Sequence, residues 1–223
     1  MRKEIYLIKG TKNEGYEQFT NRILELAKSI SQNEQVSQIR INYTAVQPPK
    51  MSVIPFKRDK VAAVSVYFSD INNGIFLKGE PGFSGGYRVE EVLPVTYEKS
   101  WEDGSKTPGV CLLTLFQKKK NMDCNTFINR WHNGHTPLSL KIHPLWNYNR
   151  NVVKEKLTDD SYEWDGIVEE HFRTSSDLLN PAKFFGNPLV MIYNMLRVYF
   201  DTHSFIDYKT IKPYLTSEIW IKS

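Results

Sequence analysis

His135 is the residue whose type and position most favour chemistry in this chain. At about 3.6 residues per turn it falls on one apolar helical stripe with Phe127, Trp131, Leu138 and Ile142. Pro137 cannot donate a hydrogen bond to the carbonyl four residues earlier, so the helix is expected to bend near Gly134. An imidazole at such a bend, between a helix and a sheet, could act as a general acid or base. The alternative is a core histidine that is hydrogen-bonded to the backbone or to Tyr148.

Tyr148 is the second candidate for acid/base chemistry. On an alternating strand it shares one face with Trp146 and Val152. A tyrosine in a pocket can donate a proton to a developing oxyanion, and a pair of His135 and Tyr148 would suit enolisation or cyclisation. The first half of the chain has Tyr43 in the matching strand but no matching histidine, which favours a structural tyrosine.

The segment from Asp165 to Phe172 is predicted to be a strand that carries several ionisable side chains. Glu169 and His171 point to one side of this strand, and Glu170 points to the other. We expect Glu169 to meet solvent at a sheet edge. Glu170 and His171 are candidates for lining a cavity.

The sequence predicts neither a metal site nor a phosphate-binding loop. His132 and His135 have a helical spacing that can chelate a metal, but His132 lies off the apolar stripe, toward solvent. The glycine-rich stretch Gly79–Gly86 precedes a strand rather than a helix. It therefore lacks the helix N-terminus that binds phosphate and is expected to be a surface loop.

The elements that position these residues occur twice along the chain. In the first half, strands are expected over residues 4–9, 39–43, 61–68 and 87–97, with a helix over 14–30. In the second half, strands are expected over 110–117, 145–153, 165–172 and 208–221, with helices over 124–142 and 188–200. Phe19-Thr20-Asn21-Arg22 recurs as Phe127-Ile128-Asn129-Arg130, and Asn42-Tyr43 recurs as Asn147-Tyr148. The matches predict a duplication, with one unit over residues 1–104 and another over 105–223.

This order of elements predicts an α+β fold made of two tandem ferredoxin-like βαββαβ units. Each unit would form a four-stranded antiparallel sheet with helices on one face and no cover on the other. Because one chain holds two such sheets, they can close on each other as an intramolecular, pseudo-dimeric α/β barrel. A further homodimer would then have to use other surfaces.

The second half also resembles a known family. Its helical segment from Phe127 to Pro137 is similar to the EthD pattern of an aromatic residue, a Trp and then His-x-Pro. Pro144–Asn151 resembles that family's strand with a leading proline and a tyrosine, and Trp164–Phe172 resembles its third strand, with aromatic-Asp-Gly and a closing Phe. Phe205-Ile206-Asp207 is similar to the segment that enters the last strand. In these motifs the second half resembles an EthD-type domain of the dimeric α/β-barrel superfamily.

The first half keeps the framework and departs from these motifs. Ala27 and Ile23 occupy the positions that correspond to His135 and Trp131. We therefore expect the first half to be a structural partner that supplies at most one wall of a pocket. Only the second half is expected to hold a polar, ligand-accessible pocket.

The resemblance implies a small-molecule enzyme. EthD-type and neighbouring barrels include proteins tied to the breakdown of small organic molecules, cofactor-free monooxygenases, and polyketide-type cyclases and dehydratases. We expect a cofactor-independent enzyme acting on a small hydrophobic or aromatic, carbonyl-bearing molecule. The candidate catalytic residues are His135, Tyr148 and His171, and the candidate ligand-binding residues are Phe127, Trp131, Trp146 and Glu170. The alternative is a non-catalytic ligand-binding or structural barrel.

Composition narrows the classes of function further. The 223 residues are 40% hydrophobic and 24% charged, with a net charge of +4, as is typical of a soluble globular protein. The cluster Lys118–Lys120 lies next to a turn and is expected to be a solvated loop, so no nucleic-acid partner is predicted. There is no N-terminal apolar signal segment and no apolar run long enough to span a membrane. Two cysteines without metal-type spacing, Cys111 and Cys124, favour a reducing, cytoplasmic setting.

Overall fold

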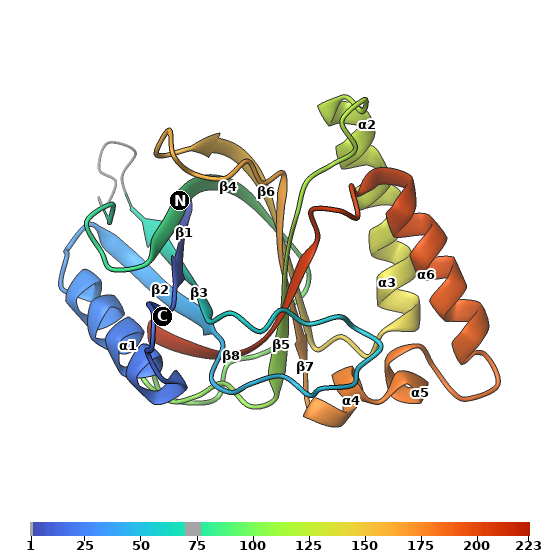
Figure 1. The fold of residues 1–223 in the computed structure, drawn as a ribbon, viewed down its shortest axis with the longest axis horizontal. Helices are drawn as coiled ribbons and strands as arrows, with labels where there is room; N and C mark the ends of the chain where they lie inside the picture. Colours follow the sequence, from blue (N-terminus) through green and yellow to red (C-terminus); the bar gives the residue numbers. More distant parts are fainter. Residues whose placement is uncertain (1, 70–76) are drawn as a thin grey trace.

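The computed structural model describes residues 2–69 and 77–223. Within these ranges, eight strands close a barrel in which every pair of neighbouring strands is antiparallel (Figure 1). The order around the barrel is β1-β3-β2-β8-β5-β7-β6-β4. Because all of these strands belong to one chain, the barrel closes without a second subunit. None of the helices in the described residues is long and apolar enough to cross a membrane.

Within its described residues, the first half supplies one helix and four adjacent strands. They are β1 (Arg2–Lys9), α1 (Tyr16–Ser31), β2 (Val36–Tyr43), β3 (Val61–Phe68) and β4 (Phe83–Val95). The apolar face of α1 is buried against the outer face of the sheet and includes Phe19, Ile23, Ala27 and Ile30. The described residues between β3 and β4 contain no helix, so this half shows βαβββ rather than a full βαββαβ order. The strand β4 begins at Phe83, so part of the glycine-rich stretch is strand and not loop.

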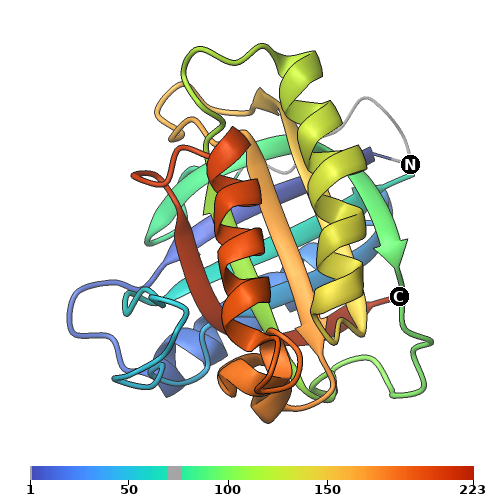
Figure 2. The same cartoon turned by 90° about the vertical axis from the view of Figure 1, so that its right-hand side faces the viewer.

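The second half carries most of the helices. It contains β5 (Val110–Phe116), α2 (Cys124–Asn129), the π-helical turn η1 (Arg130–His135), α3 (Thr136–Ile142), β6 (Asn147–Lys156), β7 (Gly166–Phe172), α4 (Ser175–Leu179), α5 (Pro181–Phe184), α6 (Met191–Phe205) and β8 (Lys212–Lys222). Its strands lie in the order β8-β5-β7-β6, which matches β4-β1-β3-β2 of the first half. Figure 2 shows α3 and α6 side by side across the outer face of these strands.

One long helix runs from Cys124 to Ile142, as the sequence predicts, and it is distorted near its centre. The Asp123 carboxylate accepts a hydrogen bond from the Thr126 N–H and so caps its start. Pro137 has no N–H to donate, and the Thr136 N–H instead reaches the Trp131 carbonyl, five residues earlier. The widened turn η1 lies where the bend was expected, and it ends at His135. Such widened turns often occur at functional sites.

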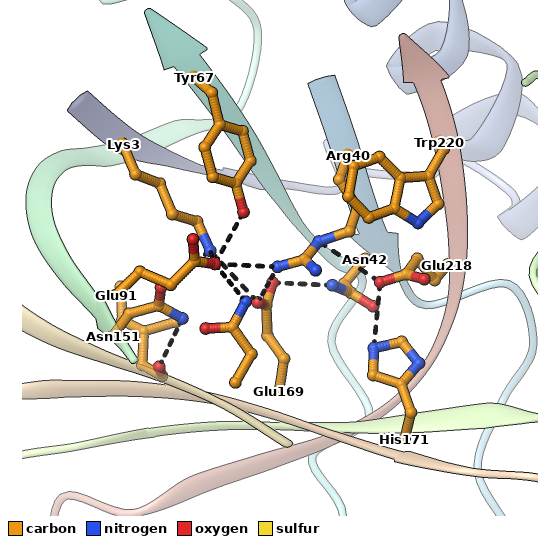
Figure 3. A network of polar contacts seen from close by, with 12 residues as sticks. Lys3, Arg40, Asn42, Tyr67, Glu91, Asn151, Glu169, His171, Glu218 and Trp220 are labelled. Carbon is orange, nitrogen blue, oxygen red and sulfur yellow. Dashed lines mark hydrogen bonds and ion pairs between the residues drawn. The ribbon is translucent and has the colours of Figure 1, made fainter. Parts of the chain in front are cut away.

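The two faces of the strands have different surroundings. On β2, Ile39 and Ile41 point outward and pack with the core beneath α1, whereas Arg40 points into the barrel. One end of the barrel interior is apolar and includes Leu113 and Tyr214. The other end is filled with charged and amide side chains (Figure 3).

Candidate functional site

A cavity of about 380 Å³ lies between the outer face of the second half's sheet and the helices that cover it. Its walls are mostly apolar and aromatic, which is typical of a site for a small hydrophobic molecule. Strands β5, β6 and β7 supply the floor, η1 and α6 supply one wall, and the α5 region supplies another. Val53, Ile54 and Pro55, in the long β2–β3 connection, add a wall from the first half of the chain.

Glu170 places a carboxyl group in this apolar cavity. It lies on the outer face of β7 and is only 9% exposed. Within the described residues, its carboxylate has neither a hydrogen-bond partner nor an ion-pair partner, in contrast to Glu169 beside it. Burial without a compensating charge raises the pKa of Glu170 to about 7. A carboxyl group with this pKa can take up and release a proton near neutral pH.

Tyr148 lies directly opposite Glu170, because the two residues are register partners on β6 and β7. It is 1% exposed, and its hydroxyl oxygen accepts a hydrogen bond from Trp131 Nε1 at 3.4 Å. Burial, with the nearby Glu170, raises the pKa of Tyr148, so the phenol keeps its proton at physiological pH. It is therefore a potential hydrogen-bond donor to an oxygen atom of a bound molecule.

His135 is held by two side chains that the sequence did not single out. Its Nδ1 lies 2.7 Å from Asp201 Oδ2 on α6, and its Nε2 lies 3.0 Å from Ser139 Oγ on α3. These contacts replace the expected hydrogen bond to Tyr148. Aspartate, histidine and serine also form nucleophilic triads, but Ser139 is fully buried and does not line the cavity. Its hydroxyl group therefore orients His135 rather than facing a substrate.

Four of the predicted site residues meet around this cavity: Trp131, His135, Tyr148 and Glu170. Phe127 lies behind the wall, where it packs against Trp131 with ring centroids 5.4 Å apart. It supports the cavity and does not line it.

Trp146 and His171 lie elsewhere, contrary to expectation. Trp146 precedes β6, so the alternation of that strand does not place it beside Tyr148; it packs on Tyr97, with ring centroids 4.9 Å apart. His171 lies on the opposite face of β7 from Glu170 and points into the barrel, where its Nε2 is 3.1 Å from Glu218 Oε2.

The expected solvent exposure of Glu169 is wrong. Its side chain is fully buried inside the barrel (Figure 3). Arg40 Nη2 lies 2.6 Å and Lys3 Nζ 3.5 Å from Glu169 Oε2, and Asn42 Nδ2 donates to Oε1 at 2.8 Å. Burial by itself would raise the pKa of Glu169, but the charges of Arg40 and Lys3 outweigh it, and the pKa is lowered.

Asp201 and His143 are cavity-side residues that the sequence reasoning missed. Asp201 shares a helical face of α6 with Val198 and Phe205, which line the cavity, so a carboxylate on an otherwise apolar face was the available signal. His143 lines the cavity and donates from Nδ1 to the Phe184 carbonyl at 2.7 Å. Burial lowers the pKa of His143 to about 4, which leaves it neutral. In the described part of the chain, no group of three His, Cys, Asp or Glu residues could hold a metal ion.

A larger cavity, of about 930 Å³, opens at the polar mouth of the barrel. Residues from both halves line it, so the expectation that only the second half holds a polar pocket is wrong. At its floor Lys3 Nζ lies 2.8 Å from Glu91 Oε1, and Arg40 Nε lies 3.4 Å from Glu218 Oε2. These charges compensate each other, whereas the Glu170 carboxylate has no partner among residues 2–69 and 77–223. The smaller cavity is therefore the stronger candidate for a reactive site.

The fold, but not the sequence, relates this chain to known proteins. No family model matches the chain, and no curated protein matches it. An anthrone oxidase-like protein of known structure superposes with a TM-score of 0.62 at 7% identity, over 98% of this chain and 90% of that one. A Fusobacterium nucleatum protein provisionally assigned as a monooxygenase gives a TM-score of 0.55 at 7% identity, over 99% and 92%. The chain thus has the fold of these two proteins, an α+β architecture with an eight-stranded antiparallel barrel flanked by helices.

Proposed function

We propose that this protein is a small-molecule oxidising enzyme that acts on a hydrophobic, aromatic, carbonyl-bearing compound by acid/base chemistry. The observation that carries the proposal is the Glu170 carboxyl group, which has no partner in the described residues and lies in an apolar cavity opposite Tyr148. Keeping an unpaired carboxyl group in such a place is costly, and costly groups of this kind concentrate at functional sites. The two structurally similar proteins named above have names that point to oxidation chemistry.

The arrangement suits removal of a proton from a carbon next to an aromatic ketone. Glu170 would take the proton, and Tyr148 would donate a hydrogen bond to the carbonyl oxygen as negative charge develops there. An anthrone illustrates the class: proton loss gives an extended enolate, which can react directly with O2. Overall, one anthrone and one O2 give one anthraquinone and one water, and this balance requires no cofactor.

His135, held by Asp201, forms a second polar edge of the cavity. Asp201 fixes the orientation of the imidazole ring, as a carboxylate next to a histidine commonly does. His135 would hydrogen-bond a second oxygen of the substrate, or return a proton to the oxygenated intermediate, through Nε2, which would exchange its contact with Ser139 for that oxygen. Trp131 and the other aromatic side chains would form the walls against which the substrate rings pack.

The alternative is a barrel that binds a ligand without transforming it, or that has only a structural role. A filled core beside His135 would have favoured a structural role, and a cavity lies there instead. The raised pKa of Glu170 favours catalysis over simple binding, because an apolar ligand gains nothing from a buried carboxyl group.

We also infer that the chain consists of two tandem ferredoxin-like units, over residues 1–104 and 105–223, of which the second is EthD-like. The matching strand orders of the two halves support this inference. So do the buried Phe19 and Phe127, which begin the repeated Phe-x-Asn-Arg sequence. The repeated arginines support it as well, because both bind backbone carbonyls: Arg22 that of Pro81, and Arg130 that of Ser204.

Oxidation of anthrone in air-saturated buffer at pH 7 tests the proposal. Anthraquinone formation and O2 uptake should rise together in a one-to-one ratio, above the rate without protein. Glu170→Gln should lower the rate at least about 100-fold, because it removes the base. Glu25→Gln, an exposed glutamate on α1, is the matched control and should keep the full rate. An unchanged rate in Glu170→Gln, or no turnover by the wild-type protein, would contradict the proposal.

A further inference from the structure

A third cavity adjoins the candidate site at the C-terminal end of α6. It has a volume of about 250 Å³, and its lining includes Lys119, Lys120 and Lys209. Ile206 and Tyr208 line both this cavity and the apolar cavity of the candidate site, so the two cavities share these side chains as a wall. The lysine cluster that the sequence suggested to be a plain solvated loop therefore lies at the edge of the candidate site.

The charges around this small cavity are not balanced. Lys119, Lys120 and Lys209 form no ion pair with any residue in 2–69 or 77–223, whereas the neighbouring Lys118 pairs with Asp165 at 3.5 Å. Asp207 is the single acidic residue in the lining. Its Oδ1 accepts a hydrogen bond from the Lys209 backbone N–H at 3.1 Å, so it is partly engaged by the local turn.

The backbone holds the lysines in place beside the site. The Lys119 N–H donates to the Phe205 carbonyl at 2.9 Å, and Lys118 forms a β-bridge with Ile206. Tyr208 stacks on His203, with ring centroids 5.0 Å apart and an interplanar angle of 21°. The Tyr208 hydroxyl is also hydrogen-bonded to Thr202, so the side chain at the junction of the two cavities is fixed.

We propose that the basic cavity, defined by Lys119, Lys120 and Lys209, binds an anionic group of the substrate. The rings of the same molecule would occupy the apolar cavity beside Glu170 and His135. This inference rests on the proposed function and narrows its substrate to an aromatic compound that carries a carboxylate or another acidic oxygen group. Unpaired ammonium groups beside an apolar cavity complement such an amphipathic anion, because the rings leave water while the charge stays at the wet edge. A nucleic-acid surface would instead need a broad basic stripe, and this cluster is compact.

Two fluorescent probes that differ by one charge test the subsite. They are 1-anilinonaphthalene-8-sulfonate, which is anionic, and N-phenyl-1-naphthylamine, which has similar rings and no charge. With wild-type protein, the anionic probe should bind more tightly, and its advantage should shrink as salt rises from about 0.05 M to about 0.5 M. The triple variant Lys119→Gln/Lys120→Gln/Lys209→Gln should weaken binding of the anionic probe roughly fivefold to tenfold. Binding of the uncharged probe should not change.

A matched triple variant, Lys12→Gln/Lys28→Gln/Lys50→Gln, removes the same charge from exposed lysines of the first half and should leave both probes unaffected. Val168→Phe, which fills part of the apolar cavity beside Glu170, should weaken binding of both probes. Binding of the uncharged probe with no advantage for the anionic one would overturn the subsite and leave the proposed function standing. Equal weakening of the anionic probe in both triple variants would also overturn it. If neither probe bound, or if Val168→Phe changed neither, the apolar site and the subsite would fall together.

Discussion

Tyr148 and Glu170 lie directly opposite each other on β6 and β7, and both side chains face the cavity beneath the helices. Residues in such register have Cβ atoms about 4.5–5.5 Å apart. A phenol that keeps its proton and a carboxyl group with a pKa of about 7 can therefore reach the same small molecule. This pair gives the cavity a proton donor and a proton acceptor on one rigid wall.

Glu170→Gln should stabilise the protein at alkaline pH. Its folded-state pKa of about 7 lies above the ordinary value of 4.5, so the folded state binds more protons than the unfolded state between these values. The contribution of Glu170 to stability therefore falls as pH rises from 4.5 to about 7, by about 3 kcal/mol in all. Urea unfolding should show a higher free energy of unfolding for the variant than for the wild type at pH 8 but not at pH 5. An equal difference at both pH values would contradict the raised pKa.

Tyr148→Phe should lower the rate of anthrone oxidation about 10²–10³-fold, because the oxyanion loses a hydrogen-bond donor. Its stability should change little, since the hydroxyl is contacted only weakly, by Trp131 Nε1 at 3.4 Å. Tyr43→Phe is the matched control, because Tyr43 is the buried tyrosine at the equivalent place in the first half. Steady-state rates and thermal unfolding of both variants separate the cases. Equal activity of the two would show that Tyr148 is structural.

Asp201→Asn tests whether Asp201 positions His135. The amide keeps a hydrogen-bond acceptor near Nδ1 but removes the charge, so the free energy of unfolding should change by less than about 1 kcal/mol. The kcat of anthrone oxidation should fall, because the carboxylate that holds the His135 ring in place is lost. His135→Ala should instead cost about 1–3 kcal/mol, since buried polar partners lose their hydrogen bonds. A kcat of Asp201→Asn identical to that of the wild type would exclude the positioning role.

Glu169→Gln should destabilise the barrel by about 1–3 kcal/mol, because it removes the buried carboxylate that both Lys3 and Arg40 contact, while Glu91 and Glu218 still balance their charge. The control is Glu155→Gln, which breaks the exposed ion pair with Arg88 and should cost less than about 1 kcal/mol. Chemical denaturation at pH 7 measures both. Similar small losses in the two variants would mean that the interior charges are not coupled.

The same network predicts acid unfolding in a defined range. Burial by itself would raise the pKa of both Glu91 and Glu218, but the nearby cations win, and each pKa is lowered to about 2. The stability that depends on their charge is thus complete above the ordinary value of 4.5 and is lost as pH falls toward 2. Circular dichroism between pH 6 and pH 2 should show cooperative unfolding below about pH 4.5. A native spectrum and native stability at pH 2 would contradict this.

The sequence by itself determined where the helices and strands form and which residues share each of their faces. Helical spacing gave the long helix that carries His135, and Pro137 gave its bend. Alternation placed Glu169 and His171 on one face of β7 and Glu170 on the other, as the structure has them. These features depend on the fixed periods of helix and strand, so neighbouring residues suffice to predict them.

Only the tertiary structure decided what covers each face. The alternation along β7 shows that its two faces differ. A face with charged residues normally faces solvent, but in the closed barrel this face lines the interior. Glu169 is stable there because Lys3 and Arg40 arrive from strands far away in the sequence. The contact between His135 and Asp201 likewise depends on how α6 packs against the long helix. Such pairings join segments that the chain does not connect locally, so no local pattern contains them.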